Sequence, residues 1–203
     1  MATTSAKTAG AVAQTSSGAG STSWTNVGGA SLQASLSNDN GDTSYAGCAS
    51  DFTGVGSNKS WDLNLTNFFT ASDVPSGATV NGVTVSIKRR NQTDNAAYDV
   101  QDVDVQLIKG GTAQGDDKAA AGDWPEGSYT AQSYGGASDL WGLTLTQADV
   151  IASDFGVRIR ITSDNNSFVD EVTHAEARIT YVTITIDYTA GSGAGRGFMM
   201  FFP

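Results

Sequence analysis

The stretch SYGGASDLWGLTLTQADVIASDFGVRIRI (residues 133–161) carries the clearest structural signals in the chain. Near its end, apolar and polar residues alternate, which is the pattern of a half-buried β-strand. The apolar positions are Phe155, Val157, Ile159 and Ile161. Upstream, Thr146 is followed three residues later by Asp149, a form of the helix N-cap signature, so we expect a short helix over residues 147–151.

The first half of the same stretch predicts a turn and a second strand. Tyr134, Gly135 and Gly136 favour a turn, because glycine adopts backbone angles that other residues resist. Trp141, Leu143 and Leu145 then recur at every second position, so we expect a strand whose buried face is anchored by Trp141. The stretch describes architecture and contains no recognisable catalytic motif.

Composition favours an all-β protein. Hydrophobic residues make up 39% of the 203 residues, charged residues only 16%, and the chain has 24 glycines. Abundant Thr, Ser, Val and Gly suit short strands and tight turns, and no long stripe at helical spacing is present. We expect an antiparallel β-sandwich of jelly-roll type over residues 24–189, with about eight strands and one short helix. An extended N-terminal arm (1–23) and a Gly-rich linker with a hydrophobic C-terminal anchor (190–203) flank it.

Four further period-two patterns predict strands. They include Leu32, Ala34 and Leu36, and the ranges 61–65, 83–87 and 103–107. The last two patterns match and are separated by a polar loop, so we expect these strands to pair antiparallel. In the 103–107 strand, Asp102, Asp104 and Gln106 are then expected to face outward.

The final strand, roughly residues 175–188, changes its apolar phase. Ala177, Ile179 and Tyr181 are odd-numbered, whereas the apolar residues from Val182 onward are even-numbered. A slip of one residue reverses the buried face of a strand. The pattern therefore predicts a β-bulge near Tyr181 and Val182, or a strand that crosses between the sheets.

The charge balance disfavours nucleic acid as a partner. The formal net charge is −10, the sequence pI is near 4.2, and the only basic run is Lys88-Arg89-Arg90. We expect this triplet to be a solvated strand end. No stretch approaches the ~20 apolar residues of a membrane span, and the N-terminal segment lacks the apolar core of a secretory signal. We expect no membrane partner and synthesis in a reducing cytoplasm.

Candidate catalytic groups are few. His174 is the only histidine, and no nucleophile–base pair or metal-ligand cluster surrounds it in the sequence. Asp102/Asp104 and Asp170/Glu171 are carboxylate pairs of the kind that glycoside hydrolysis uses. The first pair is expected to face solvent, and the adjacent residues of the second pair point to opposite faces. We therefore expect no enzymatic activity, no catalytic residues and no cofactor.

Two other features have a chemical and a plain interpretation. The loop over residues 38–42, Asn-Asp-Asn-Gly-Asp, is similar to a calcium loop but lacks the full spacing and the terminal Glu, and it fits a turn better. We expect no metal site. Cys48 is the single cysteine, so no disulfide forms within the chain, and it fits a small buried residue better than a nucleophile.

Aromatic residues leave a binding function open. Trp124 and Tyr134, with Tyr129 and Trp141, offer apolar faces on which a sugar ring stacks. The alternative is that these rings cap the core and pin loops. A carbohydrate-binding adhesin that recognises a host-surface glycan therefore stays as an alternative function, as does a subunit of a self-assembling extracellular filament.

Both ends of the chain suggest assembly. Residues 1–23 are almost entirely Ala, Thr, Ser and Gly, so we expect them to be disordered, or else to be held by a neighbouring subunit or by their own domain. At the other end a Gly-rich linker precedes large apolar residues that we expect to contact another subunit. These residues are Phe198, Met199, Met200, Phe201 and Phe202.

Four phrases in the chain carry a resemblance to known proteins. They are PSGATVNGVTVSIKR (75–89), VQLIKGGTAQGDDKA (105–119), YGGASDLWG (134–142) and TQADVIASDFGVRIR (146–160). With Trp124-Pro125 and the 169–181 region, they cover most of residues 61–188. This part of the chain resembles virion structural proteins of tailed bacteriophages that contain a β-sandwich domain. The resemblance implies a multicopy component of the virion, such as a head-decoration, collar, fibre or tail-surface subunit. Its implied partners are other copies of itself and neighbouring virion proteins.

Overall fold

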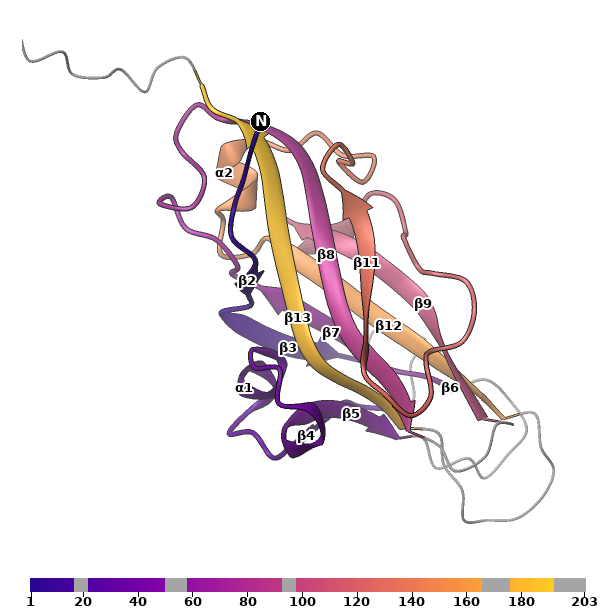
Figure 1. Ribbon diagram of the computed structural model, residues 1–203. Helices are drawn as coiled ribbons and strands as arrows, with labels where there is room; N and C mark the ends of the chain where they lie inside the picture. The colour runs from indigo at the N-terminus through magenta and orange to yellow at the C-terminus, as the bar shows by residue number, and fades with distance from the viewer. Residues whose placement is uncertain (17–21, 50–57, 93–97, 166–175, 192–203) are drawn as a thin grey trace, which may run out of the picture.

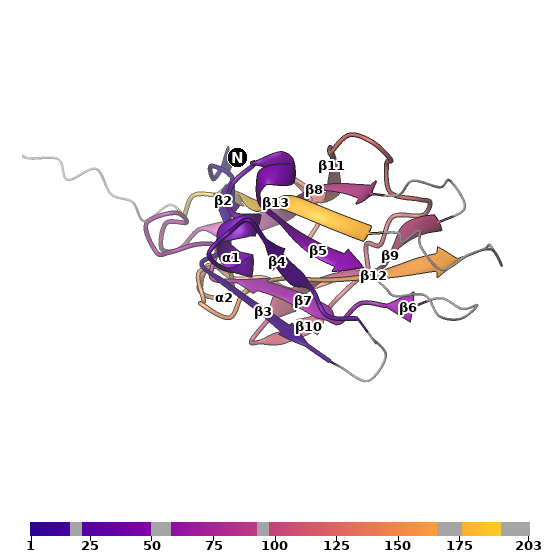
Figure 2. The same cartoon turned by 90° about the horizontal axis from the view of Figure 1, so that it is seen from below.

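The computed structural model describes residues 1–16, 22–49, 58–92, 98–165 and 176–191. Within these residues, two antiparallel sheets pack face to face (Figure 1). The predicted all-β sandwich is therefore confirmed. Figure 2 shows the two layers from below, with β13 and β8 in one layer and β12 and β7 in the other.

We call the two layers sheet A and sheet B. Sheet A follows the order β11-β8-β13-β5-β4, with β1 and β2 also paired to β13. Its strands are β1 (Ala2–Thr3), β2 (Lys7–Thr8), β4 (Thr25–Val27), β5 (Tyr45–Ala49), β8 (Thr79–Gln92), β11 (Thr130–Gly136) and β13 (Glu176–Thr189). Sheet B follows the order β10-β9-β12-β7-β3, with β6 paired to β12. Its strands are β3 (Ala11–Thr15), β6 (Asn58–Lys59), β7 (Asp62–Thr66), β9 (Tyr98–Lys109), β10 (Thr112–Gln114) and β12 (Gly156–Asn165).

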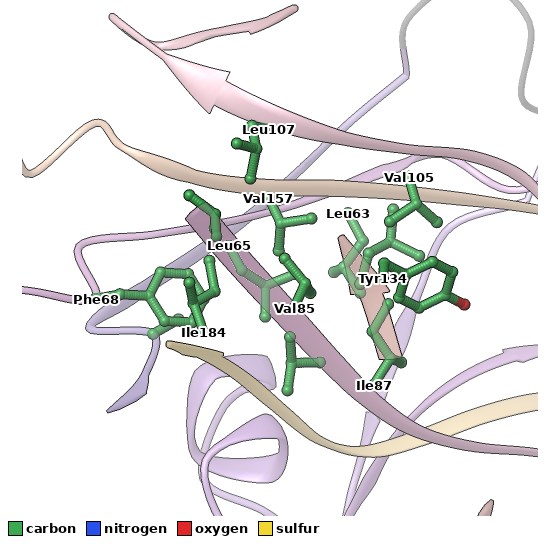
Figure 3. Close-up of a cluster of buried hydrophobic side chains, with 14 of the residues drawn as sticks. Leu63, Leu65, Phe68, Val85, Ile87, Val105, Leu107, Tyr134, Val157 and Ile184 are labelled. Carbon is green, nitrogen blue, oxygen red and sulfur yellow. The ribbon is translucent and has the colours of Figure 1, made fainter. Parts of the chain in front are cut away.

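The core lies between the sheets, where apolar side chains of both meet (Figure 3). Val85 and Ile184 come from sheet A, whereas Leu63, Val105 and Val157 come from sheet B, and all five are fully buried. Each occupies the apolar position of a period-two pattern. The strands predicted from alternation around these residues are therefore confirmed.

The predicted pairing of the 83–87 and 103–107 strands is wrong. β8 lies in sheet A between β11 and β13, whereas β9 lies in sheet B between β10 and β12. Each strand has one apolar face, and two such faces are buried equally well when the strands lie in opposite sheets across a shared core. Alternation alone does not distinguish these arrangements.

The strand predicted around Leu32 is also wrong, because this segment is a helix, α1 (Leu32–Leu36). The side chain of Ser31 accepts a hydrogen bond from the Ala34 amide and caps the helix. Leu32 and Leu36 are four residues apart, so the same apolar residues also share a helix face. A 3₁₀ helix, η1 (Gly41–Thr43), follows.

The second α-helix is the predicted one, α2 (Gln147–Val150). The Thr146 side chain accepts from the Asp149 amide, and the Asp149 carboxylate accepts from the Thr146 amide, which completes a capping box. The described residues therefore contain two short α-helices where one was expected.

The segment before α2 differs from the prediction in its backbone. Tyr134, Gly135 and Gly136 end the edge strand β11 rather than form a turn, and residues 141–145 form a turn and an irregular segment rather than a strand. Trp141 is nevertheless fully buried, and its indole N–H donates to the Val83 carbonyl at 2.9 Å. The predicted core anchor is thus confirmed, although Trp141 has a left-handed φ of 57°.

The phase change in the last strand is a β-bulge. The register of β13 against β8 shifts between Ile179 and Tyr181, so Thr180 is the extra residue. β13 stays in sheet A along its whole length. The first of the two predicted explanations is therefore confirmed, one or two residues from the expected place.

The N-terminal segment belongs to the sandwich. β1 and β2 pair with β13 in sheet A, the chain crosses over at Ala9 and Gly10, and β3 pairs with β7 in sheet B. Of the alternatives for this segment, packing on its own domain is what the structure contains for residues 1–16. Residues 192–203 lie outside the described residues.

Candidate functional site

The arginines of the described residues lie in three clusters with carboxylates. The inner cluster contains Arg89 and lies between the sheets. The sheet A cluster contains Arg90 and Arg178, and the sheet B cluster contains Arg158 and Arg160. These three clusters hold the ion pairs of every arginine in the described residues and are the candidate sites of the fold.

A bulge in β9 creates the inner cluster. Arg89 continues the inward-facing positions of β8 that Val85 and Ile87 begin. On β9 the register against β12 shifts, with Arg160 opposite Asp104 and Ile161 opposite Asp102. The extra residue turns the side chain of Asp102 from the solvent face to the core face. The expectation that Asp102 faces solvent is therefore wrong.

The Asp102 carboxylate has donors on both oxygens. Arg89 Nη1 and Trp124 Nε1 donate to Oδ1, the latter at 2.8 Å. Tyr134 Oη and the Ala120 amide donate to Oδ2 at 2.8 and 3.0 Å. The side chains of Arg89 and Asp102 are only 5% and 1% exposed. These four donors hold the Asp102 carboxylate in place between the sheets.

Trp124 and Tyr134 enclose the Arg89 guanidinium. Its Cζ lies 4.8 Å from the ring centroid of Trp124 and 5.7 Å from that of Tyr134. Burial raises the pKa of Tyr134, and the neighbouring Asp102 carboxylate raises it further. Both aromatic side chains are buried, so neither presents a stacking face to a ligand. Their proposed role as glycan-facing residues is wrong, and they cap the core instead.

The sheet A cluster is organised around Asp42. Its Oδ1 is 2.8 Å from Arg90 Nη2 and 2.9 Å from Arg178 Nη1, and it accepts from Tyr129 Oη at 3.2 Å. Arg90 lies over the ring of Tyr129, and Arg178 lies over the ring of Tyr45. The cluster ties the η1 segment to the outer face of sheet A.

This arrangement corrects the interpretation of the basic run. Lys88 alone is substantially solvated, and it pairs with Asp39 at 2.6 Å. Arg89 lies in the core and Arg90 is buried on the outer face, so the run is not a solvated strand end. The same contacts engage both carboxylates of the calcium-like loop, Asp39 and Asp42, with cations.

The sheet B cluster joins three strands. Asp104 of β9 accepts from Arg158 Nη2 at 2.6 Å and from Arg160 Nη2 at 3.3 Å, both on β12. On β7, Asp62 Oδ2 lies 3.9 Å from Arg158 Nη1, and Asp62 Oδ1 lies 3.6 Å from Arg160 Nη1. Asp104 faces outward as expected, but it is buried beneath the arginines, and this burial raises its pKa. The cluster links neighbouring strands across the outer face of sheet B.

None of these clusters has the composition of a metal site. In the part of the chain that the structure describes, no group of three or more His, Cys, Asp and Glu side chains could hold a metal ion. Cys48 is buried, which raises the pKa of its thiol to about 12 and keeps it protonated near neutral pH. His174, Asp170 and Glu171 lie outside the described residues.

The sheets also present two long, uncharged edges. Among the described residues, β3 pairs only with β7, and β11 pairs only with β8. β3 reads AVAQT and β11 reads TAQSYGG, so neither strand contains a charged residue or a proline. Natural edge strands usually carry such residues, which block pairing with another chain. Sequence reasoning missed these edges, although their lack of charge is visible in the sequence, because strand order identifies an edge.

Three further expectations concern the C-terminal assembly residues, a membrane span and the family of the chain. The assembly residues Phe198, Met199, Met200, Phe201 and Phe202 lie outside the described residues. No helix of the described residues is long and apolar enough to cross a membrane. The chain matches no known protein family, and comparison with curated proteins finds no similar sequence. The resemblance to phage virion proteins therefore stays a prediction.

Proposed function

We propose that this protein is a structural, non-enzymatic subunit of a bacteriophage virion that assembles in many copies on the particle. The observation that carries the assembly role is the pair of uncharged edges, β3 on sheet B and β11 on sheet A. An edge strand offers a row of backbone donors and acceptors to another chain. Two such edges on opposite sheets allow each subunit to contact more than one neighbour.

The strand order supports a jelly-roll connectivity as part of this proposal. Sheet A contains the order β11-β8-β13-β5, and sheet B contains the order β10-β9-β12-β7. Successive long strands thus alternate between the sheets from β5 and β7 onward, as in a sandwich of two Greek keys. This architecture is common in viral capsid and lectin domains, although a fold by itself does not determine function.

The phrases that resemble virion proteins fall on elements that build the sandwich. PSGATVNGVTVSIKR covers most of β8, and TQADVIASDFGVRIR covers α2 and the first half of β12. YGGASDLWG covers the end of β11 and the turn that buries Trp141. The resemblance therefore concerns the fold and supports a structural role better than a catalytic one.

The adhesin alternative loses its main support. Trp124, Tyr134 and Trp141 are buried, and Tyr129 stacks on Arg90. No observation in the described residues favours a sugar site over the assembly role.

Quantitative mass spectrometry of purified virions tests the particle assignment. We expect the protein in multiple copies per particle. Its absence from purified particles, with abundant protein in the lysate, would overturn the proposal.

Charged edge variants test the assembly surface. Ala13→Lys on β3 and Ser133→Lys on β11 place a lysine at exposed edge positions, and Ser76→Lys places one in an exposed turn as the control. We expect the edge variants to fold normally and to be depleted from particles, whereas the control is incorporated like wild type. Wild-type incorporation of both edge variants would contradict the role of the edges.

A further inference from the structure

We propose that residues 1–8 form an exchangeable strand, which pairs in the assembled protein with β13 of a second copy of this chain. The inference deepens the proposed assembly role and rests on it in assuming that many copies lie close together. It names the segment that is exchanged and the surface that receives it.

The receiving surface is the second edge of β13. On one side, β13 pairs with β8 along its whole length. On the other side, β5 covers only the part from Glu176 to Ile179. β1 and β2 cover the part beyond, with Thr8 opposite Thr183 and Ala2 opposite Tyr188 (Figure 1). Without residues 1–8, this part of β13 would be an open sheet edge.

The segment is held almost entirely by polar contacts. The Thr4 amide donates to the Ile186 carbonyl at 2.9 Å, and the Ile186 amide donates to Thr4 Oγ1 at 3.0 Å. Thr3 Oγ1 donates to Asp187, and Lys7 pairs with Asp73 at 2.6 Å. Met1 and the β1 residues are exposed, so no large apolar side chain anchors the segment. Water replaces polar contacts of this kind at small net cost, and release returns the conformational entropy of the chain.

The crossing after the segment is fixed to its own domain. Ala9 is buried, and its carbonyl accepts from Gln33 Nε2 at 3.0 Å. The Gly10 amide donates to the Asn67 carbonyl at 2.9 Å, and a Cβ at Gly10 would lie 2.5 Å from Asn67 Nδ2. Residues 1–8 therefore pivot about Ala9 as a unit. Fully extended at ~3.3–3.6 Å per residue, they reach about 26–29 Å, enough for an adjacent subunit.

Residues 1–8 of a second copy of this chain are the segment that matches the second edge of β13. They make the same hydrogen bonds and the same ion pair as the chain's own segment, so exchange changes no contact within the pairing. What opposes exchange is the entropy of association. A high effective concentration in an assembly offsets that entropy. Residues 1–8 then link one subunit to the next, and each β13 edge remains covered.

Cysteine crosslinking between two differently tagged full-length chains tests the exchange. One chain carries Thr8→Cys and the other carries Thr183→Cys, because these residues face each other in the pairing. Cys48 is buried and stays in both chains, and a wild-type mixture serves as the blank. Ser86→Cys replaces Thr183→Cys in the matched control. Ser86 lies one strand farther away, on the other side of Thr183, so it is about 9–10 Å from position 8, beyond the reach of a disulfide.

After mixing at high concentration and mild oxidation, we expect at least about ten-fold more linked heterodimer from the partner pair than from the control pair. A chain with both Thr8→Cys and Thr183→Cys reports on folding, because it closes an internal disulfide when the segment is in place. An internal disulfide in that chain with no heterodimer in the mixture would overturn the exchange. Equal heterodimer from partner and control pairs would also overturn it, since it reflects random collision. Either result would leave the proposed assembly role standing, because the Ala13→Lys and Ser133→Lys variants test that role separately.

Discussion

Arg89 of β8 and Asp102 of β9 form an ion pair that joins the two sheets from inside the sandwich. Both side chains are almost completely buried, and Trp124 and Tyr134 complete the cluster around them. Moving two charges out of water is costly, and their attraction offsets the cost only when both partners are present. The pair therefore makes the cluster sensitive to single substitutions.

Asp102→Ala is expected to lower the free energy of unfolding by about 3–5 kcal/mol, because it leaves the Arg89 cation buried without its partner. Urea denaturation measures the loss. The double variant Arg89→Met/Asp102→Leu removes both charges and is the control, and we expect it to be more stable than the single variant. A single variant as stable as the double one would show that the pair is not coupled.

Trp141→Ala is expected to lower the free energy of unfolding by about 3–5 kcal/mol, because it empties a fully buried position. Thermal unfolding is the measurement. Two neighbouring glycines differ in how close they lie to this indole. A Cβ at Gly135, whose φ is 72°, would lie 2.4 Å from both Trp141 Nε1 and the Val83 carbonyl oxygen, whereas a Cβ at Gly136 would meet nothing within 4 Å. Gly135→Ala should therefore lower the melting temperature much more than Gly136→Ala. Wild-type melting of Trp141→Ala would mean that the indole is not a core anchor.

The Lys7–Asp73 ion pair makes the stability of the pairing between β2 and β13 depend on pH. The hydrogen bond from Lys7, followed by that from the Thr70 amide, holds the pKa of Asp73 below its usual range. A carboxyl with a lowered folded-state pKa contributes stability above its unfolded pKa, and that contribution is lost as pH falls through the folded pKa. We expect hydrogen-exchange protection of the Lys7 amide, which lies opposite Ile184, to fall when the pH drops below about 4.

Asp73→Asn removes this dependence and is expected to weaken the pairing of β2 by about 0.2–1 kcal/mol at neutral pH, as for other ion pairs at a protein surface. Asp39→Asn breaks the comparable Lys88 pair elsewhere on the surface and should leave β2 protection unchanged. If hydrogen-exchange protection of β2 were unchanged in Asp73→Asn, the Lys7–Asp73 pair would not stabilise the pairing of the N-terminal segment.

Deletion of residues 198–203 tests the predicted hydrophobic anchor. The deleted sequence is FMMFFP, and burial of each Phe or Met side chain contributes about 1.5–3 kcal/mol. We expect the truncated protein to keep the wild-type melting temperature and to be lost from particles or oligomers. A lower melting temperature would indicate instead that these residues pack on their own sandwich, and normal incorporation would rule out the anchor.

Local patterns determined β12 and the α2 helix, although they also predicted strands at residues 32–36 and 141–145, where the structure has none. The alternation in β12 follows from the pleat of a strand, and the Thr146 and Asp149 cap of α2 lies within a single helical turn. The phase change near Tyr181 likewise predicted a bulge or a strand that crosses between the sheets, because a one-residue slip reverses a strand's faces. All three patterns depend only on residues close together in the sequence, although the choice of the bulge needed the strand order.

Tertiary structure decided which faces meet. Alternation of apolar and polar residues predicts that β8 and β9 each have one buried face. That face is buried equally well whether the two strands pair within one sheet or lie in opposite sheets across the core. The bulge in β9 leaves a weaker trace in the sequence, because only Val100, which is buried, departs from the apolar phase of Val105 and Leu107. The sequence therefore predicts that Arg89 belongs to a solvated basic run, and only the fold places Asp102 of the opposite sheet beside it. Similarly, residues 1–16 have too little apolar surface to order themselves, and the open edges of β13 and β7 provide the hydrogen bonds that order them.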